Sequence, residues 1–326
     1  MMLFRDLKRS SIKKILVVSL SNIGDVVLTC PVVDALIDSF PLAEISLIVG
    51  PKAVTLFDQS PYIKKVYPFT KKESWGELLS LFGALKGEGF DAVIDLRNTA
   101  LAYLLGAPFH TSGFFRQDPS RHKKDQHFSR LMSVFPDMIL SQNRYAVFVN
   151  ELVRKKAEML LQPTMGTSKT YFVFSAGAAD VRKRWTVEGF VAVARALLKD
   201  HPIPIFFIGD DKDEEYTQRI VEQLPPAAVN LAGKASLLES TWILRNSHLV
   251  FCNDSAVMHL ASYFDVPVLG LFGPTDPMRY GPWGQRGAFL KTDRFDANRL
   301  GLIEGIKVSD VLEKINEILY RGTAKF

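Results

Sequence analysis

Short apolar runs alternate with stretches of helical spacing along the first half of the chain. Runs of the length expected for buried strands occupy residues 15–19, 45–49, 65–69 and 92–96. Apolar residues at helical spacing lie between them, at residues 32–40, 53–58 and 75–86. Strands and helices that alternate in this way predict right-handed βαβ crossovers and a parallel sheet.

The second half repeats this alternation after a polar interval. Residues 110–143 are polar and basic, 151–161 predict a helix, and 162–169 have the composition of a linker. The remaining apolar runs predict strands at 171–175, 203–208, 229–231, 249–252 and 266–272, with helices at 187–199, 214–224, 237–245 and 255–264. We therefore expect two α/β domains, residues 1–163 and 164–326. An amphipathic helix at about 308–320 ends the series, and one expected arrangement packs it back on the N-terminal domain.

The stretch 249–277 points most directly to a ligand. A buried strand is broken by Asn253 and Asp254, Ser255 can cap the helix that follows, and a second strand ends in Gly273-Pro-Thr-Asp-Pro277. Ligands of open α/β sheets bind beyond the carboxyl ends of the strands, so we expect both domains to offer loops to a shared cleft. A helix N-terminus at such a point favours phosphate.

Composition narrows the class of protein. The chain has 326 residues, a net charge of +5 and two cysteines, Cys30 and Cys252, without metal-type spacing. We expect both to be small buried residues outside any disulfide. No apolar run approaches the roughly 18–20 residues that span a bilayer, and the N-terminal pattern does not fit a signal peptide. These features predict a cytoplasmic protein.

Positive charge is concentrated between His110 and Arg130. The basic residues of this segment are His110, Arg116, Arg121, His122, Lys123, Lys124, His127 and Arg130. One interpretation is a solvated loop, and the other is a surface that receives an acidic second substrate. Phe114, Phe115 and Phe128 lie among the charges, so stacking against nucleic acid is a further alternative.

Two other loops follow predicted strands. In Ser19-Leu-Ser-Asn-Ile-Gly-Asp25, Gly24 permits a tight turn and Asp25 is expected at the mouth of the cleft, although a helix-capping role is the simpler interpretation. In residues 175–185, small residues precede Arg182, Lys183 and Arg184, which suits a phosphate site without the pattern of a P-loop. The Gly-x-Gly-x-x-Gly pattern of dinucleotide cofactors is missing.

Acidic residues 210–215 are open to two interpretations. They suit a metal site less well than a helix N-terminus, because nothing else in the sequence converges on a hard cation. We expect no metal and no cofactor.

Four stretches in register resemble the bacterial heptosyltransferases of glycosyltransferase family 9. They are Lys14-Ile-Leu-Val-Val-Ser-Leu-Ser-Asn-Ile-Gly-Asp-Val-Val-Leu-Thr-Cys-Pro31, Lys183-Arg-Trp185, Asn253-Asp-Ser-Ala-Val-Met-His-Leu-Ala261 and Leu271-Phe-Gly-Pro-Thr-Asp-Pro277. The resemblance extends from about Lys13 to Tyr320. It implies the GT-B fold of two Rossmann-like domains, and transfer of heptose from ADP-L-glycero-D-manno-heptose to the inner core of lipopolysaccharide. It also implies inversion without a metal, on a lipid A/Kdo-type acceptor at the cytoplasmic face of the inner membrane, and no nucleic acid.

The resemblance also implies roles for particular residues. Asp25 matches a proposed general base, Lys183 the lysine that stabilises the diphosphate, and Asp254 the aspartate that holds the donor sugar. The further donor-binding candidates are Ser175, Gly177, Ala178, Gly209, Asn230, Ser255, Ala256, Val257, His259, Thr275 and Asp276. The acceptor-binding candidates, besides Asp25, are Asn22, Gly24, Arg116, Arg121, Lys123 and Lys124. The chain departs from the family at Ala256, Val257 and Asn230, where glycine, proline and a carboxylate are usual.

Two further functions remain open at this point. Another sugar-nucleotide enzyme with the GT-B fold, using a different donor sugar or acting as a 2-epimerase, would share the same loops. A binder of anionic lipid or nucleic acid would use the basic segment without catalysis.

Overall fold

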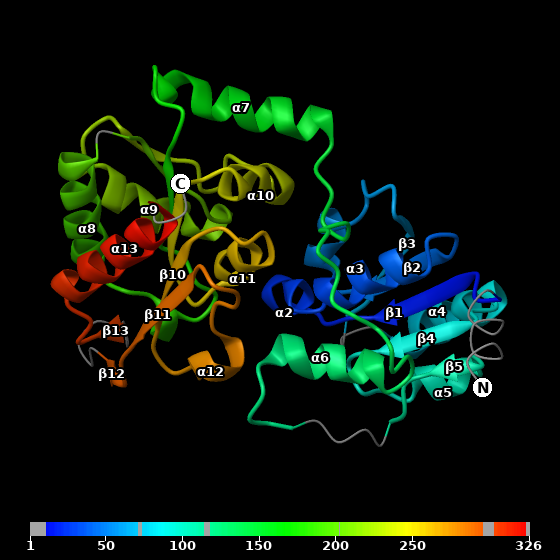
Figure 1. Ribbon diagram of the computed structural model, residues 1–326. Helices are drawn as coiled ribbons and strands as arrows, with labels where there is room; N and C mark the ends of the chain where they lie inside the picture. Colours follow the sequence, from blue (N-terminus) through cyan, green and yellow to red (C-terminus); the bar gives the residue numbers. More distant parts are fainter. Residues whose placement is uncertain (1–10, 71–73, 114–117, 202, 296–302, 324–326) are drawn as a thin grey trace. The chain divides into compact units, whose positions relative to one another are not determined.

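The computed structural model describes residues 11–70, 74–113, 118–201, 203–295 and 303–323, which pack as two compact units (Figure 1). The first unit comprises residues 1–148 and the second residues 149–326. Each unit is built on its own parallel sheet. Among the described residues, none of the helices combines the length and the apolar character that crossing a bilayer requires.

The first unit has a five-stranded sheet in the order β3-β2-β1-β4-β5, and all its neighbouring strands are parallel. Its strands are β1 (Lys14–Val18), β2 (Glu44–Val49), β3 (Ile63–Pro68), β4 (Ala92–Asp95) and β5 (Phe109–His110). Its helices are α2 (Ile23–Val27), α3 (Cys30–Ser39), the 3₁₀-helix η1 (Pro51–Leu56), α4 (Trp75–Glu88), α5 (Leu101–Leu105) and α6 (Lys123–Met132).

The second unit has a six-stranded parallel sheet in the order β11-β10-β9-β6-β7-β8. Its strands are β6 (Phe172–Ser175), β7 (Ile205–Phe207), β8 (Ala228–Asn230), β9 (Leu249–Asn253), β10 (Val268–Phe272) and β11 (Gly287–Lys291), beside a small antiparallel pair, β12 (Arg294–Phe295) and β13 (Ile303–Glu304). Its helices are α7 (Glu151–Met165), η2 (Val181–Lys183), α8 (Val187–Asp200), η3 (Asp211–Asp213), α9 (Glu214–Val221), α10 (Leu237–Arg245), α11 (Ala256–Tyr263), α12 (Pro277–Tyr280) and α13 (Val308–Thr323).

The core of the second unit is rich in aromatic rings. Phe174 packs edge-on against Phe207 and Phe251, and Trp185 packs edge-on against Phe251. Such pairs add about 0.5–1.5 kcal/mol each to the gain from burial. This layer supports the strand ends from which the loops of the sheet emerge.

The terminal helix α13 belongs to this core. Its buried residues Val311, Ile315 and Ile318 lie in the same apolar cluster as Phe174, and the helix lies beside α8 (Figure 1). The apolar face of this helix is therefore used within the second unit, whereas the sequence-based expectation allowed it to pack back on the N-terminal domain. Helix α7 likewise packs against α10 within the second unit, although the sequence had placed it before the domain boundary at residue 163.

Several elements of the first unit differ from the sequence-based expectation. Residues 53–58 were expected to form an α-helix, but the 3₁₀-helix η1 covers most of them. Strand β5 and helix α6 lie in the region 110–143 or at its edge, for which no regular structure was predicted. Strand β11 of the second unit was also not predicted, because its half-buried pattern does not form an apolar run.

Helix α6 buries two of the basic residues that the sequence placed in a charged segment. Arg130 is fully buried and donates hydrogen bonds to the carbonyl oxygens of Asp95 and Ser112. His127 is 4% exposed, and neither ring nitrogen has a hydrogen-bond partner among the described residues. Part of the basic segment is therefore core, which rules out both a wholly solvated loop and a continuous charged surface.

The loop after β1 is fixed by close packing on Gly50. The backbone N–H of Gly50 donates to the carbonyl oxygen of Leu20 at 3.0 Å, and a Cβ atom at residue 50 would overlap the carbonyl of Ser21. Only glycine allows the two backbones to approach so closely.

The substitution Gly50→Ala is expected to lower the free energy of unfolding by about 1–3 kcal/mol, because backbone atoms must shift to admit the methyl group. Gly83→Ala is the matched control, since nothing lies within 4 Å of a Cβ atom there and residue 83 is inside helix α4. The control is expected to gain about 0.5–1 kcal/mol from helix propensity. Urea unfolding of both variants measures the difference, and equal effects would contradict the packing argument.

Burial makes stability depend on the charge of His127. Desolvation, with Lys123, Arg130 and His122 nearby, lowers the pKa of His127 to about 3. The unfolded chain binds a proton near pH 6.5 and the folded chain does not, so stability is lost as pH falls from about 6.5 toward 3.

Between pH 7.5 and pH 5 the protein should therefore lose roughly 2 kcal/mol more stability than the His127→Gln variant, which has no titrating ring. Urea unfolding at the two pH values measures this difference. Parallel pH profiles for the two proteins would show that His127 is charged in the fold.

Candidate functional site

Both sheets have the strand order that creates a ligand-binding position at the strand ends. In the second unit the first strand, β6, lies between β7 and β9, and the chain leaves β6 toward one side and later returns on the other. In the first unit β1 has the same position between β2 and β4. Loops diverge at such a switch point, and in open α/β sheets this is the place, beyond the carboxyl ends of the strands, where ligands generally bind.

At the switch point of the second unit, the buried amide of Asn253 connects the two loops. Its Nδ2 donates to the carbonyl oxygen of Ala176 at 2.7 Å, and its Oδ1 accepts from the backbone N–H of Trp185 at 3.1 Å. Asn253 is fully buried. Both ends of the loop from residue 176 to residue 185 are thereby held against the end of β9. From the sequence, Asn253 was expected to break the strand and to open a family-like stretch, whereas its role in holding the loop is a finding of the structure.

This arrangement brings Lys183 and Asp254 together. The Nζ atom of Lys183 lies 2.7 Å from Oδ2 of Asp254, in a pair whose side chains are 28% and 5% exposed. Asp254 Oδ2 and Ser255 Oγ are buried atoms that make no hydrogen bond of good geometry with the described residues. The site therefore combines a partly exposed cation with two buried oxygens, of which Asp254 Oδ2 faces Lys183 and Ser255 Oγ has no hydrogen-bond partner among the described residues. Lys183 and Asp254 are 71 positions apart in the sequence, and both were candidate site residues. The structure brings them together.

A second ion pair braces the same loop from the other side. Arg184 donates from Nε and Nη2 to the carbonyl oxygen of Ala178, and its Nη2 lies 3.1 Å from Oδ1 of Asp213. A Cβ atom at Gly177 would overlap the carboxylate of Asp213, so a larger residue there would have to displace that side chain. Desolvation raises the pKa of Asp213. The sequence placed Asp213 at a helix N-terminus, but its side chain reaches across to the loop after β6.

The other donor candidates of the second unit lie at or near these strand ends. Asn230 is 4% exposed, and its amide bonds to the backbone of Glu214 and Ala232 and to Gln218, so its side chain holds β8 to α9. His259 is 5% exposed and stacks on Trp283 with ring centroids 5.8 Å apart.

The rest of the donor candidates are strand-end, turn or helix-start residues. Asp276 caps α12 and Thr275 precedes it. Gly209 follows β7, where a Cβ atom would contact Asp213. Ser175 ends β6, Ala178 accepts from Arg184, and Ala256 and Val257 are half-buried in the first turn of α11.

At the switch point of the first unit, Asp25 lies in the short helix α2. Its Oδ2 accepts a hydrogen bond from the Nδ2 of Asn22 at 3.1 Å, and its side chain is half-buried. Its other carboxylate oxygen accepts no hydrogen bond from the described residues, so it can still receive a proton or a donor group. Gly24 lies inside α2 and does not form the expected tight turn. Asp95, at the end of β4, differs from Asp25 because both of its carboxylate oxygens accept hydrogen bonds. The donors are the backbone N–H of Arg97 and the backbone N–H and hydroxyl of Thr99.

Of the acceptor candidates in the basic segment, Lys123 and Lys124 begin helix α6, and Arg121 lies just before it. Arg121 donates to Ser129, Lys123 to Gln126, and Lys124 lies 2.6 Å from Asp125. Arg116, together with Phe114 and Phe115, lies outside the described residues. Both lysines lie in the first turn of α6. Lys123 contacts the neutral side chain of Gln126, and Lys124 contacts the neighbouring Asp125.

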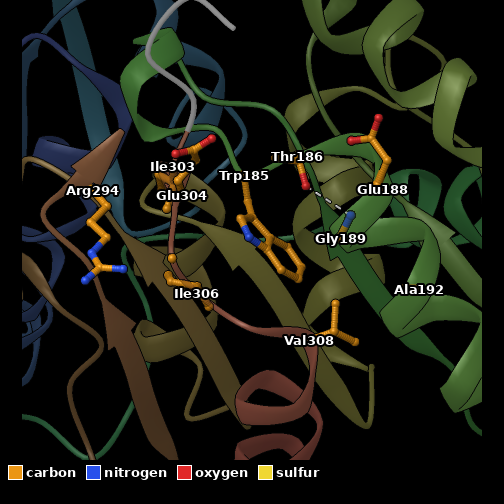
Figure 2. Close-up of a pocket in the computed structure, with 11 residues that line it drawn as sticks. Trp185, Thr186, Glu188, Gly189, Ala192, Arg294, Ile303, Glu304, Ile306 and Val308 are labelled. Carbon is orange, nitrogen blue, oxygen red and sulfur yellow. Dashed lines mark hydrogen bonds between the residues drawn. The ribbon is translucent and has the colours of Figure 1, made fainter. Parts of the chain in front are cut away.

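A further cavity borders the same loop. It encloses about 570 Å³ and is lined by α8, by Arg294 and by the segment around β13 (Figure 2). Trp185 forms part of its wall, beside Thr186, whose hydroxyl accepts from the N–H of Gly189 at the start of α8. Its lining includes none of the residues that the sequence analysis proposed. Among the described residues, no cluster of histidine, cysteine and carboxylate side chains is suited to a metal ion.

Comparisons with known proteins connect this geometry to a family. The sequence profile of glycosyltransferase family 9 (heptosyltransferase) matches residues 78–298, more than half of the chain. The lipopolysaccharide core heptosyltransferase OpsX of Haemophilus influenzae is 25% identical over 288 residues, which cover 83% of this chain and 82% of that protein.

Two solved structures share the fold. A family 9 glycosyltransferase from Veillonella parvula has a TM-score of 0.79 at 23% identity, covering 96% of this chain and 99% of that one. The E. coli heptosyltransferase WaaC, solved with ADP, has a TM-score of 0.72 at 20% identity, covering 94% and 99%. The expected fold class, GT-B with two parallel-sheet α/β domains, is confirmed.

Proposed function

Because the chain belongs to glycosyltransferase family 9 (heptosyltransferase), we propose that it moves heptose from ADP-L-glycero-D-manno-heptose to the inner core of lipopolysaccharide. The proposal includes inversion at the anomeric carbon and independence from metal ions. Two observations support it: the Haemophilus influenzae relative is a lipopolysaccharide core heptosyltransferase, and the E. coli heptosyltransferase of the same fold was solved with ADP. The observation that carries it is the Lys183–Asp254 pair at the switch point of a Rossmann-type sheet.

The donor half of the reaction is assigned to the second unit. Lys183 and the first N–H groups of α11, at Ala256 and Val257, supply positive charge for the two phosphates. Asp254 accepts hydrogen bonds from sugar hydroxyls, and Ser255 Oγ is an additional polar contact. The ammonium group and the backbone N–H donors stabilise the negative charge that develops on the leaving diphosphate. Because they are already in position, they need not reorient at the moment of transfer.

The acceptor half is assigned to the first unit. The acceptor hydroxyl oxygen attacks the anomeric carbon, the bond from that carbon to the diphosphate oxygen breaks, and ADP leaves with the electron pair. The hydroxyl proton passes to the free oxygen of Asp25, while Asn22 holds the other oxygen. A single carboxylate base suffices for direct displacement, which inverts the configuration. Lys123, Lys124 and Arg121 are proposed to bind anionic groups of the lipid acceptor, at the cytoplasmic face of the inner membrane.

Direct transfer is the first test of this function. The protein is incubated with ADP-heptose and a lipid A/Kdo-type acceptor, and products are identified by mass spectrometry. Heptosylated acceptor and free ADP are expected in equal amounts. Incubation of the nucleotide sugar alone distinguishes the alternative, because a 2-epimerase would change the sugar without an acceptor.

Asp25→Asn is expected to lower kcat by about 10²–10⁴-fold, because the amide cannot accept the acceptor's proton. The affinity for ADP should not change, since this residue belongs to the acceptor half. Asp58→Asn, at an exposed aspartate of the same unit, is the matched control and should turn over normally. Steady-state rates and ADP titration calorimetry measure the two quantities, and normal turnover in Asp25→Asn would remove this residue from the mechanism.

Lys183→Gln is expected to cost about 2–4 kcal/mol of transition-state stabilisation, or roughly 30- to 1,000-fold in kcat/KM. The neighbouring substitution Arg182→Gln is its matched control, because Arg182 is 63% exposed and pairs with Asp180. The thermal shift produced by ADP should disappear in the first variant and persist in the second. Equal losses in both variants would indicate a general charge effect and not a specific diphosphate contact.

A further inference from the structure

Helix α4 of the first unit has an apolar stripe that faces solvent. Trp75 is 83% exposed and Leu79 is 68% exposed, and Phe82 lies half-buried on the same helical line. The spacing of these residues, at i, i+4 and i+7, places them on one face. The helix is anchored to the sheet by a different face, on which Leu85 is buried and Leu81 packs against the core. The exposed stripe is therefore not needed to hold the helix in place.

The neighbouring helix α5 repeats this feature. It packs beside α4 and buries Ala102, while Tyr103 is 67% exposed and Leu104 is 59% exposed. We call Trp75, Leu79, Tyr103 and Leu104 the α4–α5 face. Single exposed apolar residues are common on soluble proteins, but exposed tryptophan, tyrosine and leucine on adjacent helices indicate a contact surface.

The charges around this face favour an anionic partner. Lys86 continues the stripe one turn beyond Phe82, with its Nζ 5.7 Å from the centre of that ring, and it forms no ion pair with a described residue. The two carboxylates of α4 are locally engaged. Glu77 bonds to Ser74 in the capping box, and Glu88 bonds to Tyr67 and Lys65. Glu77 keeps its own negative charge, because Ser74 is neutral, whereas Glu88 is shared by Lys65 and Lys14. The lysines of α4 and of its ion-pair partners (Lys14, Lys65 and Lys86) therefore outnumber its two carboxylates, and Lys86 is the cation that is left for a phosphate group.

We propose that the α4–α5 face is a membrane-docking surface that inserts its apolar side chains among anionic phospholipids. Tryptophan and tyrosine suit the interface between headgroups and acyl chains, and a lysine at the edge of the apolar stripe pairs with lipid phosphate. The choice of a lipid surface over a protein partner rests on the proposed function, because a lipid-anchored acceptor must be reached at a membrane. The face lies in the unit to which the acceptor half is assigned.

Vesicle binding by the full chain tests this surface without requiring activity. Co-sedimentation with vesicles of phosphatidylethanolamine and phosphatidylglycerol is compared with vesicles of phosphatidylcholine. The double variant Trp75→Ser, Leu79→Ser should partition about tenfold more weakly into the anionic vesicles, or weaker still. The matched control is Leu152→Ser, Met159→Ser, which removes two exposed apolar residues from α7, 62% and 69% exposed. The control should bind within about twofold of the unchanged protein.

Fluorescence locates the contact. Trp75 is the most exposed of the four tryptophans, so its emission should shift to shorter wavelength when vesicles are added. Trp75→Phe should lose this shift and retain binding, because phenylalanine keeps the apolar contact. Binding that leaves the emission unchanged, or that falls equally in both double variants, would overturn the proposal. Sedimentation velocity covers the remaining alternative, since self-association through this face without vesicle binding would also overturn it.

Kinetics separate this inference from the proposed function. The α4 double variant should transfer heptose normally to an acceptor freed of its acyl chains, and its KM for the vesicle-embedded acceptor should rise several-fold. If the unchanged protein transfers no heptose but binds vesicles through Trp75, only the proposed function fails. If transfer occurs and KM for the embedded acceptor is the same in both proteins, the docking surface fails.

Discussion

The amide of Asn253 is the contact on which the candidate donor site depends. One side chain satisfies a carbonyl at the start of the loop after β6 and an N–H at its end, at a point where water has no access. Loss of such an amide leaves two buried backbone groups without partners, each costing about 1–3 kcal/mol. Because Lys183 lies two residues before the N–H that Asn253 holds, the ammonium group is fixed relative to Asp254, the residue that follows Asn253 in the chain.

The Arg184–Asp213 pair adds a second, weaker constraint on the same loop. Its members are 20% and 14% exposed, and desolvation raises the pKa of Asp213 even beside an arginine. Such a pair adds little net stability but loses much when one partner is removed, since the other charge is then left partly buried. Gly177 and Gly209 leave room for the Asp213 side chain, so residues of the loop after β6 and of the loop after β7 share one small volume. Asn253 holds both ends of the loop, and Arg184 joins Ala178 of the same loop to Asp213 of the next.

Strand ends could be predicted from the sequence, whereas contacts between distant loops could not. Apolar runs such as 249–252 locate buried strands, and the polar residues that follow them must then lie at the sheet edge, which is why Lys183 and Asp254 were found. Strands β5 and β11 were missed because short or half-buried edge strands lack that signal. His127 and Arg130 were read as part of a charged segment, because the burial of a helix face depends on what packs against it. Asp213 was missed for the same reason, since its partner is 29 residues away.

The Lys183–Asp254 pair also constrains how a nucleotide sugar can lie in the proposed site. Asp254 is almost fully buried, so its carboxylate needs a neighbouring cation or hydrogen-bond donors. A diphosphate placed against it would add two further negative charges, whereas sugar hydroxyls would donate hydrogen bonds to it. Lys183 is more exposed and can keep Asp254 on one side while its other N–H groups meet phosphate oxygens. In the proposed site we therefore place the sugar beside Asp254, and the diphosphate between Lys183 and the start of α11. In that order the ammonium group lies at the bond that breaks, where the leaving-group charge increases most.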